Sequence, residues 1–530
     1  MTALAATPEL TPLERPARRR VGGPLIIVGI GLVALGMYLW QLSVPEQLSF
    51  YDSGVYLAAA VHLVSGVLPY RDFTFVQPPG LLYLLAPVAV ASRVFGTHDG
   101  LTIGRALSAV VTAANCSLAA SLVRGHGRVA MAVTGAAVAV SPVAFLVSSA
   151  IKLDPFSLLF VLVAFVVVLG HGRVATLSRR GAVVAGVALG VAGLVKLWAF
   201  FPFVAVVALV SWRARARVVA LVAAAGATFL AGVAPFLVTA PHRFISEVFV
   251  EQLGRRANAS DSGTLLWRLR ALTGYFDTLV APSARVAVAA FALLALAVAV
   301  AYRRWRSVSD TEWLVLFGAI AVVVMLLASP ETYTYYDYYA QPFLYALAVT
   351  ALWRLGRGLA GVLGRPALSR GTRRVVIGAG VASLVLAVGS MTLYTTSFYS
   401  AYAYVYGYYG RWMGLVTRAV PAGSCVVYNQ VAFGVYANRL ITSDPACPTV
   451  VDVYGEWMGN GYQLVAPPRS FSREWLGYFE RARYAVFTRA RPGDIPWDAS
   501  LTRWFDRHYR LVANQQFVFV FKHTTSTTGR

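Results

Sequence analysis

Two polar stretches near the start of the chain hold the residue types best suited to chemistry. Asp52 comes soon after the first long apolar segment, and Asp72 lies in a second polar stretch that ends at Gln77. A carboxylate at a membrane face, partly desolvated by neighbouring aromatic side chains, can act as a general base on a hydroxyl. Asp52 could equally cap a helix that begins near Gly54. Residue type alone leaves both interpretations open.

Lysine is scarce, which draws attention to the lysines that occur inside apolar sequence. Lys152 precedes Asp154, the sole acidic residue within 100–246, and Lys196 lies near the end of another apolar run. Asp154 followed by Pro155 is typical of a helix start with Asp154 as the N-cap, which accounts for Asp154 but not for Lys152. A lysine in such a place either extends its ammonium to the membrane interface or forms a functional site, for which a buried phosphate is a suitable partner.

A third candidate region, residues 330–342, is rich in tyrosine. It contains Asp337, Tyr338, Tyr339 and Gln341. Aromatic belts at membrane interfaces explain tyrosines without any function. They explain the carboxylate and the amide less well, and aromatic rings beside such groups also suit sugar binding.

Composition places these residues in a membrane protein. Of the 530 residues, 58% are hydrophobic and only 13% are charged, and the mean hydropathy is +0.63. Soluble proteins are about a quarter charged. The net charge of +23 would suit a nucleic-acid partner, but the arginines gather in short linkers between apolar runs, which is the positive-inside pattern. We therefore expect no nucleic-acid partner. The preference for Ala, Val and Arg suggests a GC-rich genome, such as that of an actinobacterium.

The apolar runs predict a mainly α-helical protein with about eleven spans. They lie at 24–43, 103–123, 129–148, 156–170, 181–196, 198–211, 218–240, 280–301, 312–329, 341–353 and 375–395. Linkers rich in arginine alternate with linkers that carry acids, so the acidic set (44–102, 149–155, 241–279 and 330–340) is predicted to face outward. Residues 1–23 become a cytoplasmic tail, and 24–395 form the transmembrane domain.

The apolar run 80–95 does not fit as a span, because a span there would invert every later linker. We predict a re-entrant or interfacial helix on the outer side instead. Residues 396–530 are then exoplasmic. A small α/β domain is predicted there by strand-like runs that Gly, Pro and Asn separate, at 426–428, 484–487 and 517–521. Cys425 and Cys447 both lie in this domain and could form a disulfide in an oxidising compartment.

Five of these features occur in the order found in a known superfamily. They are Asp52 after the first span, Pro69-Tyr70-Arg71-Asp72-Phe73 with Pro78-Pro79-Gly80, Asp154-Pro155, Gly193-Leu194-Val195-Lys196, and Tyr338-Tyr339 with Gln341-Pro342. Over residues 24–345 the chain resembles the GT-C superfamily of polytopic glycosyltransferases. The branch it resembles holds the protein mannosyltransferases that use polyprenyl-phosphate-mannose and the bacterial aminoarabinose transferases.

The resemblance implies transfer of a sugar from a polyprenyl-phosphate donor to an acceptor hydroxyl, with inversion, on the outer face of a bacterial plasma membrane. It assigns catalysis to Asp52 and Asp72, the donor phosphate to Lys196, Lys152 and Arg71, and substrate positioning to Asp154, Gln77, Tyr56, Tyr338, Tyr339 and Gln341. Ser53 and Val76 stand where many relatives have acids, so the use of a divalent cation stays open.

Two other functions remain as alternatives. A transporter or flippase for lipid-linked glycans would carry ionisable groups at mid-membrane and often an internal repeat, and we find no repeat. An inactive accessory protein would be consistent with Ser53 and Val76. The sugar (mannose, arabinofuranose or another) and the acceptor (protein, lipid or cell-wall glycan) are left open.

Overall fold

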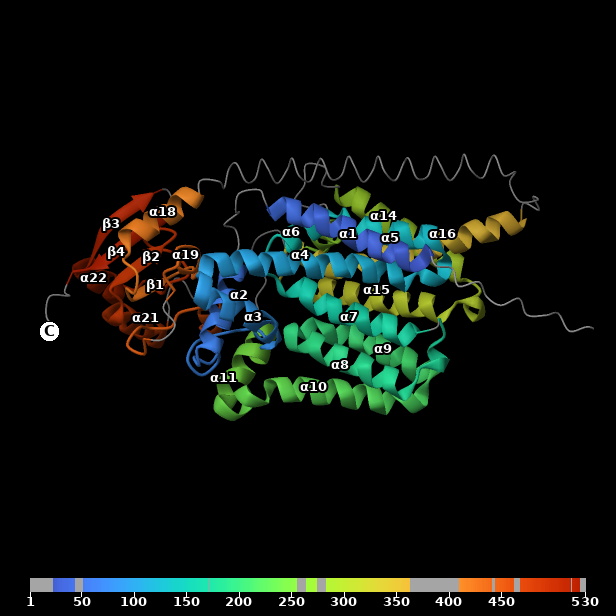
Figure 1. The fold of residues 1–530 in the computed structure, drawn as a ribbon, viewed down its shortest axis with the longest axis horizontal. Helices are drawn as coiled ribbons and strands as arrows, with labels where there is room; N and C mark the ends of the chain where they lie inside the picture. Colours follow the sequence, from blue (N-terminus) through green and yellow to red (C-terminus); the bar gives the residue numbers. More distant parts are fainter. Residues whose placement is uncertain are drawn as a thin grey trace, which may run out of the picture.

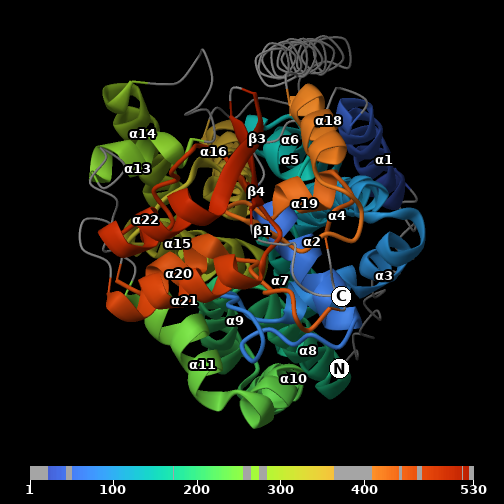
Figure 2. The ribbon, with the colours of Figure 1, turned by 90° about the vertical axis from the view of Figure 1, so that its left-hand side faces the viewer.

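The computed structural model describes most of the chain as helix (Figure 1). The described residues are 22–42, 51–170, 172–254, 264–273, 283–362, 409–440, 444–461, 468–515 and 517–524. Their helices run side by side in one bundle, and a smaller unit with a β-sheet sits against one end of that bundle (Figures 1 and 2).

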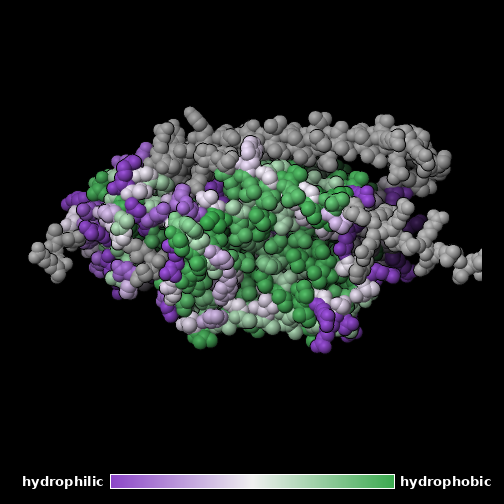
Figure 3. Space-filling view, viewed as in Figure 1, coloured by the Kyte–Doolittle hydropathy of each residue, from purple (hydrophilic) through white to green (hydrophobic). Residues whose placement is uncertain are grey.

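The bundle consists of helices that coincide with the predicted apolar runs. They are α1 (Gly22–Leu42), α4 (Thr97–Leu122), α5 (Arg128–Ala139), α6 (Pro142–Ser148), α7 (Leu153–Leu169), α8 (Arg179–Val195), α9 (Phe200–Arg213), α10 (Val218–Thr239), α14 (Ala284–Tyr302), α15 (Asp310–Ala328) and α16 (Gln341–Val362). Five described helices are long and apolar enough to span a membrane, or six if the bent pair α5–α6 is one span. The predicted span at 375–395 lies outside the described residues. The face of the bundle seen in Figure 3 is apolar in its middle and hydrophilic toward both ends.

Ion pairs tie the arginine-rich linkers together at one end of the bundle. Glu312 accepts hydrogen bonds from His126 at 3.2 Å and from Arg354 at 2.8 Å, and Arg213 lies 3.1 Å from Asp310. These residues come from the linker before α5, the end of α9, the start of α15 and the body of α16. The alternation predicted from linker charge therefore matches the arrangement of the helices.

The apolar run 80–95 forms α3 (Gly80–Phe95), which lies at the opposite end of the bundle. It packs against α2 (Tyr51–Val64) and meets the end of α8, where a Cβ on Gly80 would stand 2.5 Å from the backbone of Leu194. This end of the bundle is the one next to the sheet-containing unit (Figure 1). The position agrees with the prediction of a helix that stays at one end of the bundle and does not span it.

The C-terminal unit is a four-stranded mixed sheet covered by helices. Its elements are α18 (Tyr409–Ala419), β1 (Val426–Tyr428), α19 (Ala432–Tyr436), α20 (Val453–Gly459), α21 (Arg469–Arg481), β2 (Tyr484–Phe487), α22 (Ala499–His508), β3 (Tyr509–Gln515) and β4 (Val518–His523). The strand order is β1-β2-β4-β3, with β1 and β2 parallel and the other pairs antiparallel. Strands β1, β2 and β4 are the strand-like runs of the sequence, whereas the more polar β3 was not predicted.

The C-terminal unit packs closely on the first loop of the bundle. Gly54 of α2 meets Ala432 of α19 so closely that a Cβ would stand 2.6 Å from the Ala432 Cα. A disulfide joins Cys425, directly before β1, to Cys447 in the loop that follows α19. The start of α2, where Asp52 lies, is thus held between the two units.

Candidate active site

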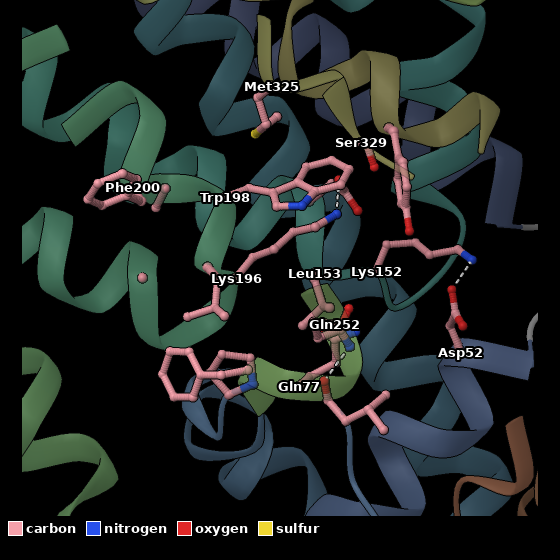
Figure 4. A pocket seen from close by; sticks show the side chains of 18 of the residues that line it. Asp52, Gln77, Lys152, Leu153, Lys196, Trp198, Phe200, Gln252, Met325 and Ser329 are labelled. Carbon is pink, nitrogen blue, oxygen red and sulfur yellow. Dashed lines mark hydrogen bonds and ion pairs between the residues drawn. The ribbon is translucent and has the colours of Figure 1, made fainter. Parts of the chain in front are cut away.

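A cavity of about 1160 Å³ opens where the helical bundle meets the C-terminal unit. Polar side chains from both units and apolar side chains from α8, α9 and α10 line it. Two pairs of lysine and aspartate dominate its polar part, and Figure 4 shows Lys196, Lys152 and Asp52 following one another across it.

The first pair joins the two predicted outer loops. Lys152 Nζ donates to Asp52 Oδ2 at 2.6 Å, and the Tyr335 hydroxyl donates to the same oxygen at 3.2 Å. Ser53 holds the loops in register, because its hydroxyl accepts from the Ile151 amide at 3.0 Å. Burial by itself would raise the pKa of Asp52, but Lys152 and Tyr335 outweigh it and hold the pKa below its ordinary value. Asp52 is therefore a carboxylate at neutral pH, and its recorded hydrogen bonds are not those of a helix cap.

The second pair lies deeper. Lys196 Nζ donates to Asp154 Oδ1 at 2.7 Å, and the two side chains are only 7% and 1% exposed. The ammonium also lies 3.5 Å from the centroid of the Trp198 ring and 4.2 Å from that of Tyr336, in cation–π geometry. Asp154 is in the first turn of α7 without capping it, because the N-cap position is Lys152. The capping interpretation of Asp154 is therefore wrong.

An apolar arm extends from the two lysines between α8, α9 and α10. Its lining includes Leu189, Gly190, Gly193, Phe200, Phe203, Gly226 and Phe229. Gly226 leaves open space, because a Cβ there would have no neighbour within 4 Å. The cavity therefore combines a cationic, aromatic centre with an apolar groove that runs along membrane helices.

The backbone of the first loop is clamped by the segment that follows α10. Glu247 Oε2 accepts from the Phe75 amide at 2.9 Å, and Gln252 Nε2 donates to the Val76 carbonyl. These contacts set the position of Gln77, which lines the cavity together with Tyr56. Glu247 is 4% exposed, and burial raises its pKa to about 7.

Asp72 and Arg71 are not brought to this cavity. They form an ion pair of 2.7 Å with each other, with 31% and 48% of their side chains exposed, and neither lines the cavity. The Arg71 guanidinium lowers the pKa of Asp72, which also accepts from the Leu68 amide at 2.7 Å. The pair closes a turn of the first loop and stands apart from Asp52.

The tyrosine-rich loop contributes to the cavity through different residues from those predicted. Tyr338, Tyr339 and Gln341 are fully buried in the bundle and do not line the cavity. Tyr339 shares a hydrogen bond of 3.0 Å with Ser157, and the amide of Gln341 has no hydrogen-bond partner among the described residues. Their neighbours Tyr333, Tyr335 and Tyr336 line it instead. Nothing in residue type distinguishes the two sets of tyrosines.

The C-terminal unit supplies a wall of the cavity that the sequence did not predict. Gln430, Asp452, Tyr454 and Asp494 line it. Asp452 caps α20 and accepts from the Tyr51 hydroxyl at 2.9 Å, while Tyr454 donates to Glu331 at 2.9 Å. Burial raises the pKa of Tyr51, and the carboxylates of Asp452 and Asp494 raise it further. Both acids thus lie close to the residue that precedes Asp52.

In the cavity that the structure describes, the carboxylates of Asp52 and Asp154 are paired with lysines and not gathered in a cluster. Within the described ranges, no three His, Cys, Asp or Glu side chains gather as metal ligands do. Asp52 and Asp154 each hold a lysine ammonium where a metal ligand would hold the ion.

Comparisons with known proteins give a consistent set of likenesses. Residues 75–330 match the model of Glycosyltransferase family 87. ArnT from Cupriavidus metallidurans, in its crystal structure bound to undecaprenyl phosphate, matches with a TM-score of 0.60 and 16% identity, over 96% of this chain and 100% of that chain. The apo oligosaccharyltransferase of Archaeoglobus fulgidus matches with a TM-score of 0.51 and 14% identity, over 97% of this chain and 76% of that chain. No protein of curated function matches the chain.

Proposed function

Since the chain has the fold of the GT-C superfamily of polytopic glycosyltransferases, as its first-loop motifs predicted, we propose that it is a membrane glycosyltransferase that uses a polyprenyl-phosphate-linked sugar. The observation that carries this proposal is the junction of two buried lysines with an apolar groove beside Asp52. ArnT, which shares the fold, was crystallised with undecaprenyl phosphate, a lipid of the kind proposed here.

The two lysines suit the phosphate of such a donor. Lys196 and Lys152 present ammonium groups in a cavity walled by Trp198 and Tyr335, where charge interactions are stronger than in water. The polyprenyl chain would follow the apolar groove past Gly226, and the phosphate would meet the lysines at its inner end. A lipid substrate explains why the site is built inside a membrane bundle.

Asp52 is placed to act as the base. The acceptor oxygen attacks the anomeric carbon while Asp52 takes the hydroxyl proton, and the bond from that carbon to the phosphate oxygen breaks. The electron pair stays on the departing polyprenyl phosphate, whose growing negative charge the lysines stabilise. A single displacement of this kind inverts the anomeric centre. A donor phosphate that engages Lys152 also competes with Asp52 for the ammonium, which frees the carboxylate to accept the proton.

Transfer from a radiolabelled polyprenyl-phosphate sugar, measured in membranes that carry the full chain, tests the proposal. We expect Asp52→Asn to lower the rate at least 100-fold, in the range found for general-base catalysis. Glu480→Gln, a matched change of an exposed carboxyl group to an amide on α21, serves as the control. Wild-type transfer by Asp52→Asn would overturn the assignment of the base. Movement of lipid-linked sugar across vesicles without any transfer would favour the transporter instead.

A further inference from the structure

The wall of the cavity formed by the C-terminal unit differs chemically from the wall formed by the bundle. The bundle contributes the two lysines, whereas the C-terminal unit contributes the carboxylates of Asp452 and Asp494 and the amide of Gln430. Asp52 lies between the two, because it pairs with Lys152 on one side and its neighbour Tyr51 hydrogen-bonds Asp452 on the other. In Figure 4, too, the orange ribbon of the C-terminal unit passes on the Asp52 side of the view.

This wall is built from the carboxyl ends of two parallel strands. Gln430 follows β1, and Asp494 lies in the loop that follows β2, the parallel neighbour of β1. In open sheets that contain parallel strands, ligands bind in the crevice outside the carboxyl ends of those strands. Here that crevice is part of the cavity itself.

Hydrogen bonds from Asn429 hold the carboxylate of Asp494 in place. Asn429, which is 1% exposed, donates from Nδ2 to the Asp494 oxygens at 3.2 and 3.4 Å and to Thr488 Oγ1 at 3.0 Å. The Thr488 amide in turn donates to Asn429 Oδ1 at 2.9 Å. A carboxylate offers about four acceptor sites, so the bonds from Asn429 leave acceptor capacity for a ligand. The neighbouring Gln430 side chain has no partner among the described residues and offers both a donor and an acceptor.

We infer that this wall, centred on Asp494 and Gln430, is the acceptor subsite and that it takes a neutral, polyhydroxylated glycan. Sugar hydroxyls donate to carboxylates, and an amide completes such a network. The two carboxylates repel phosphate and uronate groups, which keeps an anionic acceptor out while the lysines hold the anionic donor. The inference rests on the proposed function and assigns the second substrate of the same reaction.

Steady-state kinetics of the full chain in detergent test the inference. The probes are a polyprenyl-phosphate sugar as donor and octyl glycosides of neutral hexose and pentose disaccharides as acceptors, with octyl uronides as the anionic counterpart. We expect Asp494→Asn and Gln430→Ala each to raise the acceptor KM about tenfold while the donor KM stays unchanged. Glu480→Gln, at an exposed position of α21 in the same unit but outside the cavity, is the matched control. Thermal unfolding of each variant shows that it is folded.

The outcomes separate this inference from the proposed function. A wild-type chain that transfers to neutral acceptors but not to uronides, with the KM effects above, supports the subsite. Transfer by the wild type with an unchanged acceptor KM in both variants would overturn it, as would uronides used as well as neutral glycosides. A wild-type chain that binds the neutral glycoside, seen as saturation-transfer NMR signals lost in Asp494→Asn, but transfers no sugar would retain the subsite and refute the transferase.

Discussion

The hydroxyl of Tyr51 donates a hydrogen bond of 2.9 Å to Asp452 and accepts one of 2.8 Å from the amide of Tyr454. The residue before the proposed base is thereby fixed to the N-terminus of α20, about four hundred positions further along the chain. Together with the contact of Gly54 on Ala432, this bond docks the first turn of α2 on the C-terminal unit. The C-terminal unit therefore helps to position Asp52 and also forms one wall of the cavity.

We expect Tyr51→Phe to lower kcat about tenfold without changing the donor KM. The ring still fills its place, but the hydrogen bonds to Asp452 and the Tyr454 amide are lost, and a hydrogen bond to a charged group contributes about 1.5–3 kcal/mol. Initial rates at varied donor concentration check this expectation. If donor KM rose and kcat stayed constant, Tyr51 would act on donor binding and not on the position of Asp52.

The pair of Lys196 and Asp154 allows structural and functional effects to be separated. Lys196→Met leaves the Asp154 carboxylate buried without its ammonium, which costs about 3–5 kcal/mol of stability. Lys196→Met combined with Asp154→Leu removes both charges and should recover most of the unfolding temperature. Activity should stay absent, because the leaving phosphate then lacks its cation. Recovery of transfer in the double variant would show that the pair is only structural.

The apolar arm of the cavity predicts a dependence on lipid length. Gly226→Leu places a side chain in open space within the arm, so the protein should fold while the polyprenyl chain is obstructed. We expect the KM for a long-chain donor to rise about tenfold, or ~1.4 kcal/mol, and that for a donor with two isoprene units to change little. Gly36→Leu, on the exposed face of α1 with equally open space, is the control. Equal effects on both donors would show that the lipid lies elsewhere.

The sequence predicted the membrane fold well because span length and linker charge are properties of contiguous segments. Ten apolar runs became helices, and linker charge correctly separated the two ends of the bundle, so Asp52, Lys152 and Lys196 could be expected on one side. The pairing of Asp52 with Lys152 could not be predicted, because it depends on Ser53 bringing loops about a hundred residues apart into register.

The candidate site residues of the sequence and the residues that line the cavity differ where residue type does not distinguish neighbours. Asp72 matched a family motif but pairs with the adjacent Arg71, because that guanidinium reaches it within a tight turn. Tyr335 reaches the cavity while Tyr338 is buried in the bundle, although both occur in the same run of tyrosines. No local sequence pattern marks Asp494 as a site residue, because its place in the wall of the cavity depends on the pairing of β1 with β2.

The pKa of Glu247 predicts how stability changes with pH. Burial raises this pKa from its ordinary value of 4.5 to about 7, so between these values the folded chain binds more protons than the unfolded chain. Stability is then full below about pH 4.5 and falls as the pH rises to 7, by at most ~3 kcal/mol from this group. Glu247→Gln should reduce that fall in thermal unfolding between pH 5 and 7.5, although Glu456, whose pKa burial also raises, keeps part of it. An unchanged pH dependence would show that Glu247 is ionised in the folded state.

The cysteines offer a test of the predicted orientation in the membrane. Cys425 and Cys447 are joined, and Cys116 is buried, so the unmodified chain should not react with a membrane-impermeant maleimide. Arg510→Cys on β3 and Arg215→Cys between α9 and α10 place single exposed thiols at opposite ends of the molecule. If linker charge reports orientation correctly, intact spheroplasts should label only Arg510→Cys, and permeabilised ones should label both. Labelling of Arg215→Cys alone in intact spheroplasts would invert the topology and place the cavity on the cytoplasmic side.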